Sequence, residues 1–117
     1  MAEVIIWHNP RCSKSRGACG LLEERDVDVE VRRYLDDPPS REELERVLDL
    51  LGLDDPRQMM RTGEARYKDL GLAEAEAGEL LDAMVADPVL IERPIVIRGD
   101  RAVIARPPER LQELIDG

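Results

Sequence analysis

The sequence predicts an α/β protein with one mixed sheet, ordered β-α-β and then β-β-α, with a block of helices inserted between the two halves. Three observations predict it. A strand–helix–strand pattern opens the chain, a hairpin and a helix close it, and the region at about 36–92 places apolar residues at helical spacing. Since neither half of the sheet could bury its faces alone, we expect one domain over 1–117, with the insertion at about 36–92.

The first half of the sheet begins with the apolar run at residues 3–7, which reads as a buried strand. A helix is predicted at about 14–25, and alternation from Val29 toward Tyr34 and Leu35 predicts a second strand. Strand, helix and strand over about 30 residues imply a parallel pair with a right-handed crossover. We expect the inward face of the helix to carry Ala18, Cys19, Leu21 and Leu22.

The insertion contains the clearest helix signal of the chain. Ser40 and Glu43 have the spacing of a capping box, in which each side chain accepts a hydrogen bond from the backbone of the other residue. Apolar residues follow at helical spacing, and Gly52 is placed to end the helix. Shorter helical segments are expected at 56–60, 67–70 and 74–86, the last ended by Asp87-Pro88.

The second half of the sheet is predicted as a hairpin. Two apolar runs at 94–98 and 102–105 flank Gly99-Asp100, which suits a two-residue turn. Pro107-Pro108 then opens a last helix. Its inward side chains are expected to be Leu111, Leu114 and Ile115.

Composition excludes several classes of protein. The 117 residues are 43% hydrophobic, and 17 basic against 26 acidic residues give a net charge of -9, which disfavours nucleic-acid binding. No apolar run reaches the roughly 18 residues of a membrane span, and the N-terminus lacks the pattern of a signal peptide. We therefore expect a cytoplasmic protein with reduced cysteines, no nucleic-acid partner and no membrane association.

The segment from His8 to Arg16 carries the predicted chemistry. Cys12 follows a buried strand and precedes a helix, where backbone N–H groups have no partners within the helix and lower the pKa of a thiol. Arg11, Lys14 and Arg16 add positive charge. His8 either assists the thiolate or only packs at the strand end. The segment predicts a thiolate nucleophile beside a small anion site.

Cys19 is expected to be a core thiol. On an intact helix, seven residues separate it from Cys12 by about 10 Å of rise, whereas a disulfide needs Cα atoms within roughly 7 Å. Two cysteines are also too few for a tetrahedral zinc site. Cys12 must therefore work with an external thiol, or without disulfide chemistry.

Six segments in order resemble the glutaredoxin-linked arsenate reductase family, which has a thioredoxin-like fold, and they span nearly the whole chain. They are His8-Asn9-Pro10-Arg11-Cys12-Ser13-Lys14-Ser15-Arg16, Tyr34-Leu35-Asp36-Asp37-Pro38-Pro39, Met60-Arg61, Tyr67-Lys68-Asp69-Leu70-Gly71-Leu72, Glu92-Arg93-Pro94-Ile95-Val96 and Ala105-Arg106-Pro107-Pro108-Glu109.

The resemblance implies a site and a reaction. Cys12 would attack arsenate, assisted by His8, while glutathione as co-substrate and glutaredoxin as partner would reduce the adduct to arsenite in arsenic resistance. The oxyanion would be bound by Arg61, Arg93 and Arg106, with Ser15 and Arg16 as further substrate-binding candidates. Guanidinium groups suit an oxyanion because they bond it in bidentate fashion. No bound cofactor or metal is expected. The family also implies a cis peptide bond at Arg93-Pro94.

Two further functions stay open. One is a related glutathione-linked thiol oxidoreductase with another small substrate, because Arg11 and Ser13-Lys14 flank Cys12 where the best-studied arsenate reductases of the family have different residues. The other is a redox or transcriptional regulator that binds RNA polymerase, although Ser15 stands where such relatives carry a second cysteine. The phosphatase-like C-x5-R loop is excluded, because Ala18 occupies the position of its arginine.

Overall fold

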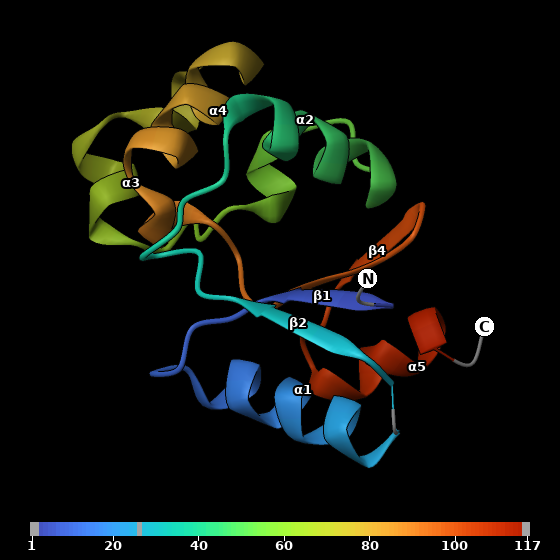
Figure 1. Cartoon of the computed structure of the whole chain (residues 1–117). Coiled ribbons are helices and arrows are strands. Elements are labelled where there is room, and N and C mark those ends of the chain that lie inside the picture. The colour runs from blue at the N-terminus through green and yellow to red at the C-terminus, as the bar shows by residue number, and fades with distance from the viewer. Residues whose placement is uncertain (1–2, 26, 116–117) are drawn as a thin grey trace. The chain divides into compact units, whose positions relative to one another are not determined.

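A computed structural model of the chain describes residues 3–25 and 27–115, and these residues form two compact units (Figure 1). The sheet unit combines Met1–Asp37 with Arg93–Gly117, and the helical unit is Pro38–Glu92. The helical unit lies close to the predicted insertion at about 36–92. That the two units constitute a single domain over 1–117 stays a prediction.

The sheet unit has the predicted β-α-β and β-β-α halves, and its four strands have the order β2-β1-β3-β4. β1 pairs with β2 in parallel and with β3 antiparallel, and β3 pairs with β4 as the predicted hairpin. Gly99 starts the hairpin turn with a φ of 61°. The elements are β1 Val4–Trp7, α1 Ser13–Glu24, β2 Val29–Arg32, β3 Ile95–Arg98, β4 Arg101–Ile104, η4 Pro108–Arg110 and α5 Leu111–Ile115.

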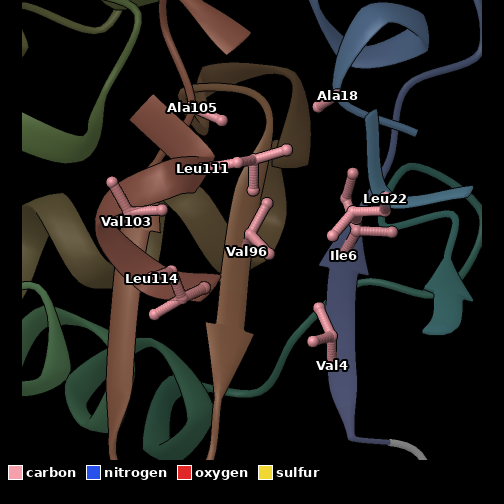
Figure 2. Packing of buried hydrophobic residues seen from close by; sticks show 9 residues of the cluster. All are labelled: Val4, Ile6, Ala18, Leu22, Val96, Val103, Ala105, Leu111 and Leu114. Carbon is pink, nitrogen blue, oxygen red and sulfur yellow. The ribbon is translucent and has the colours of Figure 1, made fainter. Parts of the chain in front are cut away.

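The core of the sheet unit lies where α1 and α5 pack on one face of this sheet (Figures 1 and 2). Burying a Leu, Ile or Val side chain stabilises a fold by about 1.5–3 kcal/mol, so this cluster anchors both helices. Its members are Val4, Ile6, Ala18, Leu22, Val96, Val103, Ala105, Leu111 and Leu114. The predicted inward residues Cys19, Leu21 and Ile115 are partly buried at its margin.

The helical unit follows its sequence signals closely. Ser40 caps α2, and the reciprocal bonds of the capping box with Glu43 are both formed, at 3.2 and 3.0 Å. Gly52, at a φ of 71°, ends the helix, because its N–H and that of Leu53 turn back to carbonyls of the last turn. The elements are α2 Arg41–Leu50, η1 Pro56–Met59, α3 Ala65–Asp69, η2 Leu72–Glu74, α4 Ala77–Ala86 and η3 Pro88–Leu90.

A single arginine ties the short helices of this unit together. The Arg57 guanidinium donates to the carbonyl oxygens of Leu72, at 3.0 Å, and of Ala73, at 3.1 Å, and also to that of Ala75. These are the carbonyl groups around η2, which a helix this short cannot satisfy by itself. The Arg57 side chain therefore supplies the hydrogen-bond donors that the backbone does not provide to the carbonyl groups around η2.

Three boundaries differ from the sequence prediction. β2 ends at Arg32, and Tyr34 and Leu35 lie in a turn, because the Arg33 carbonyl accepts hydrogen bonds from the N–H groups of Asp36 and Asp37. The segment expected at 67–70 belongs to α3, which begins earlier, and α4 begins at Ala77 rather than Glu74. Across residues 3–25 and 27–115, no helix has both the length and the apolar character to cross a membrane.

Two glycines inside α1 provide a test of the packing around this helix. A Cβ at Gly20 would meet nothing within 4 Å, whereas one at Gly17 would lie 3.3 Å from Pro108 Cγ at the start of η4. We expect Gly20→Ala to raise the free energy of unfolding by about 0.5–1 kcal/mol, because alanine favours the helix. Gly17→Ala should gain less, because Pro108 must shift. Urea denaturation measures both, and an equal gain would contradict the close approach of η4.

Candidate active site

Four chain segments meet at one edge of the sheet unit. The parallel register pairs Trp7 with Arg32, so β1 and β2 both end there. The antiparallel register pairs Trp7 with Ile95 and Ile95 with Ile104, so β3 starts and β4 ends at the same edge. The segments that follow or precede these strand ends are therefore neighbours, and they include the predicted nucleophile Cys12.

Arg93 and Arg106 are brought to this edge by the strands that they flank. Arg93 lies two residues before β3, and Arg106 lies two residues after β4. The peptide bonds Arg93-Pro94 and Arg106-Pro107 are both cis, which confirms the prediction for the first. The Ala105 N–H donates to the Pro94 carbonyl at 3.0 Å and joins the two segments. The two arginines therefore flank the open end of the hairpin.

Cys12 is the N-cap residue of α1, and its thiol is partly buried. Burial alone would raise the pKa of Cys12, but hydrogen bonds from the N–H groups of Ser15 and Lys14, together with the charge and a hydrogen bond of Arg93, outweigh it and lower the pKa. The first turn of α1 and Arg93 therefore favour the thiolate, which is the nucleophilic form.

His8 and Ser15 form a buried polar contact beside this nucleophile. The Nδ1 atom of His8 lies 2.6 Å from Ser15 Oγ and 3.5 Å from Cys19 Sγ. Ser15 is fully buried, and its Oγ accepts a hydrogen bond from the Asn9 N–H at 3.0 Å. The Ser15 hydroxyl can donate its proton to His8 Nδ1 when the ring carries its proton on Nε2.

This contact bears on two of the predicted roles. The pKa of His8 is lowered by burial and by the nearby charges of Arg33 and Arg16, so the ring is neutral at neutral pH. The contacts of His8 Nδ1 are with Ser15 and Cys19, so assistance from His8 to the Cys12 thiolate stays a prediction. The same holds for a substrate contact of Ser15, because its buried hydroxyl already has partners within the chain.

Cys19 has the environment expected of a core thiol. It belongs to the intact helix α1, it is partly buried, and both cysteines are free thiols. Burial and the nearby Glu23 carboxylate raise its pKa, which is the opposite of the effect at Cys12. The pKa values of the two thiols are therefore shifted in opposite directions, because Cys12 lies at the start of α1 near Arg93 and Cys19 lies inside the helix near Glu23.

The remaining predicted residues lie in different settings. Arg16 is exposed and donates to the Pro10 carbonyl at 3.0 Å, which braces the loop before Cys12. Arg61 belongs to the helical unit, where its guanidinium lies 3.3 Å from the Glu64 carboxylate. Its N–H donates to the Leu90 carbonyl at 2.7 Å. Convergence of Arg61 on the anion site stays a prediction.

A cleft of about 400 Å³ lies beside the Cys12 loop within the sheet unit. One wall is the loop that leads into Cys12, and the other is the turn after β2. A hydrogen bond of 2.7 Å from the His8 N–H to the Arg32 carbonyl connects the two walls. The lining residues are His8, Asn9, Pro10, Arg11, Arg33, Leu35 and Asp36. Our sequence analysis did not single out Arg33 as a site residue. The predicted parallel pairing of the first two strands could have placed Arg33 near the Cys12 loop, because parallel strands end at the same edge of a sheet.

Residues 7–114 match the model of the ArsC family. The arsenate reductase of Neisseria meningitidis serogroup A is 45% identical over 98% of this chain and 100% of the relative, and that of Haemophilus influenzae is 46% identical over 96% and 98%. The structure of an arsenate reductase from Vibrio cholerae superposes with a TM-score of 0.93, at 45% identity, over 96% of this chain and 97% of that one.

The fold and the position of Cys12 first define the structural class of the protein. A mixed sheet with a cysteine at the start of its first helix and a cis proline before its third strand is a thioredoxin-like fold. Within that class, the chain belongs to the ArsC family. The resemblance that rested on six short segments is thereby confirmed.

The depressed pKa of Cys12 predicts a distinct pH profile for its alkylation. Because only the thiolate reacts, we expect the rate with iodoacetamide to level off at lower pH for Cys12 than for Cys19, whose pKa is raised. Replacing Arg93 by Gln should move the Cys12 profile to higher pH. Arg25→Gln, at the far end of α1, is the control and should leave it in place. Mass spectrometry of the two peptides over a pH series separates the profiles, and coincident profiles would contradict the assignment.

Proposed function

We propose that this protein reduces arsenate to arsenite, with Cys12 as the nucleophile and with glutathione and glutaredoxin supplying the electrons. The observation that carries the proposal is the setting of Cys12, whose pKa is lowered by the start of α1 and by Arg93. Membership of the ArsC family and the names of its relatives supply the substrate. A perturbed thiol in a family of reductases is a candidate catalytic group.

The first step would form a bond between Cys12 Sγ and arsenic. The thiolate attacks arsenate, one arsenic–oxygen bond breaks, and the oxygen leaves as water after taking up protons. Arsenic stays in its +5 state. Arg93 and Arg106, at the same edge of the sheet, would stabilise the charge of the oxyanion, and Arg61 is the third candidate.

The second step would reduce the arsenic. The sulfur of glutathione attacks Cys12 Sγ, and the electron pair of the sulfur–arsenic bond passes to arsenic, which leaves as arsenite in the +3 state. Cys12 and glutathione are left as a mixed disulfide, each sulfur oxidised by one unit. A thiol of glutaredoxin then displaces Cys12 and restores its thiolate. An external reductant is needed because α1 holds Cys19 too far along the helix from Cys12 to form a disulfide.

The reaction can be tested directly with purified protein, arsenate, glutathione, glutaredoxin, glutathione reductase and NADPH. We expect NADPH oxidation that depends on arsenate, with arsenite as the product identified by chromatography. Cys12→Ser should abolish turnover, while Cys19→Ser should keep most of it.

Failure to form arsenite above a protein-free control would overturn the proposal. If the same protein then reduced a glutathione mixed disulfide in a Cys12-dependent manner, the thiol oxidoreductase with another substrate would be favoured. That alternative is supported by the same Cys12 environment, because the activation of the thiol is independent of the substrate.

The oxyanion site gives a second prediction. Arg61→Gln, Arg93→Gln and Arg106→Gln should each lower kcat/KM for arsenate by about 10- to 100-fold, the size of one lost charge-assisted hydrogen bond of about 1.5–3 kcal/mol. Arg25→Gln carries the same charge change at the opposite end of α1 from Cys12 and should have little effect. A kcat/KM for Arg61→Gln that equals the wild-type value would remove Arg61 from the site.

A further inference from the structure

Two arginines near the proposed nucleophile have guanidinium groups without a partner among the described residues. Arg11 and Arg33 both line the cleft of about 400 Å³ next to the Cys12 loop. Within residues 3–25 and 27–115, neither guanidinium group forms an ion pair or a hydrogen bond. Most other arginines of the sheet unit are engaged: Arg98, for example, donates to carbonyl groups of α5 and to Glu3. Two cations in one concave site favour a ligand with negative groups.

The cleft also contains one carboxylate and is rigidly built. Asp36 lies on the wall that carries Arg33, and its own N–H is fixed by the Arg33 carbonyl at 3.0 Å. On the other wall, the Asn9 side chain accepts from the Arg11 N–H at 3.0 Å, and the Asn9 carbonyl accepts from the Cys12 N–H at 3.0 Å. The arginines are therefore presented from two fixed turns, with an anionic group beside them.

We infer that this cleft binds glutathione, through its two carboxylates on Arg11 and Arg33 and its ammonium group on Asp36, and so delivers the thiol to Cys12. The inference rests on the proposed function only in taking glutathione as the reductant. Glutathione has two carboxylates, one ammonium group and a central thiol, which matches the two guanidinium groups and one carboxylate of the cleft. Cys12 directly follows the lining residue Arg11 in the chain.

The dimensions suit this ligand. A tripeptide extends over roughly 10 Å, and its central thiol lies about half that length from either end. Arg11 directly precedes Cys12, and adjacent Cα atoms are about 3.8 Å apart. A carboxylate held at Arg11 would therefore leave the thiol of the tripeptide within reach of the Cys12 loop. A cleft of about 400 Å³ also falls in the range of small-molecule sites.

The test uses thiol exchange at Cys12, which requires no arsenate. In a Cys19→Ser background, Cys12 is converted to its mixed disulfide with thionitrobenzoate. An added thiol then attacks this disulfide, and the coloured thionitrobenzoate anion is released as the new disulfide forms. The second-order rate constant is measured for glutathione and for 2-mercaptoethanol, which has no charged group. Their ratio reports recognition of the charged peptide rather than the reactivity of Cys12.

We expect Arg33→Gln and Arg11→Gln each to lower the ratio by about 5- to 10-fold, with the rate for 2-mercaptoethanol little changed. High salt should lower the wild-type ratio and leave the variants less affected. Arg25→Gln is the matched control. Glutathione ethyl ester, which lacks one carboxylate, should lose its preference in the wild type and be less sensitive to the variants.

The outcomes separate this inference from the proposed function. Equal ratios for wild type, Arg11→Gln and Arg33→Gln overturn the inference, even if the protein reduces arsenate. A ratio that depends on both arginines supports it, even if arsenate is no substrate. If the variants instead raise the KM for arsenate and leave the glutathione ratio unchanged, the cleft binds the oxyanion, and the inference is wrong.

Discussion

The reaction proposed for this protein requires the thiolate form of a partly buried sulfur, that of Cys12. Burial of Cys12 opposes its thiolate, and the N–H groups at the start of α1 must outweigh that penalty together with Arg93. The fold fixes the position of the N–H groups that lower the pKa of Cys12, because α1 has to begin at the carboxyl end of β1 to cross over to the parallel strand β2. The arginine contribution depends on the antiparallel strand β3, which starts beside Trp7 and so delivers Arg93. One edge of one sheet therefore provides both contributions.

Charge is distributed in a way that suits an anion site in an acidic protein. The chain has a net charge of -9, and most of this excess lies on the helical unit, whereas the sheet unit has nearly equal numbers of acidic and basic side chains. Arg11, Arg33, Arg93 and Arg106 all flank the strand ends at the edge that carries Cys12. Local positive potential can thus be kept where a thiolate and an oxyanion need it, while the protein surface as a whole is acidic.

The polar contact around His8 shows how the loop before the nucleophile is held. His8, Asn9 and Ser15 are joined through one buried hydroxyl, and Arg16 donates to the Pro10 carbonyl. A buried hydroxyl with two partners is costly to disturb, so it holds the loop against the first turn of α1. The positions of Arg11 and Cys12 follow from this bracing, which is the preorganisation that a nucleophile and a binding cleft both require.

The elements that could be predicted from the sequence are those whose signals are local. The capping box of Ser40 and Glu43, the stop at Gly52, the hairpin at Gly99 and the place of Cys12 before α1 all depend on residues close in the chain. The fold class followed from their order. The predicted end of β2 was wrong, because the turn at Arg33 is formed by backbone hydrogen bonds for which the sequence has no characteristic residue pattern.

Which residues these elements bring together depends on the tertiary structure. The strand order β2-β1-β3-β4 places Arg93 against Cys12 across some 80 residues of sequence, and it places Arg33 beside the loop of Arg11. The tertiary structure also places the His8 ring in contact with Ser15 and Cys19. The physical reason is that pairing between distant strands is chosen by the burial of a shared core, which no local stretch of sequence contains.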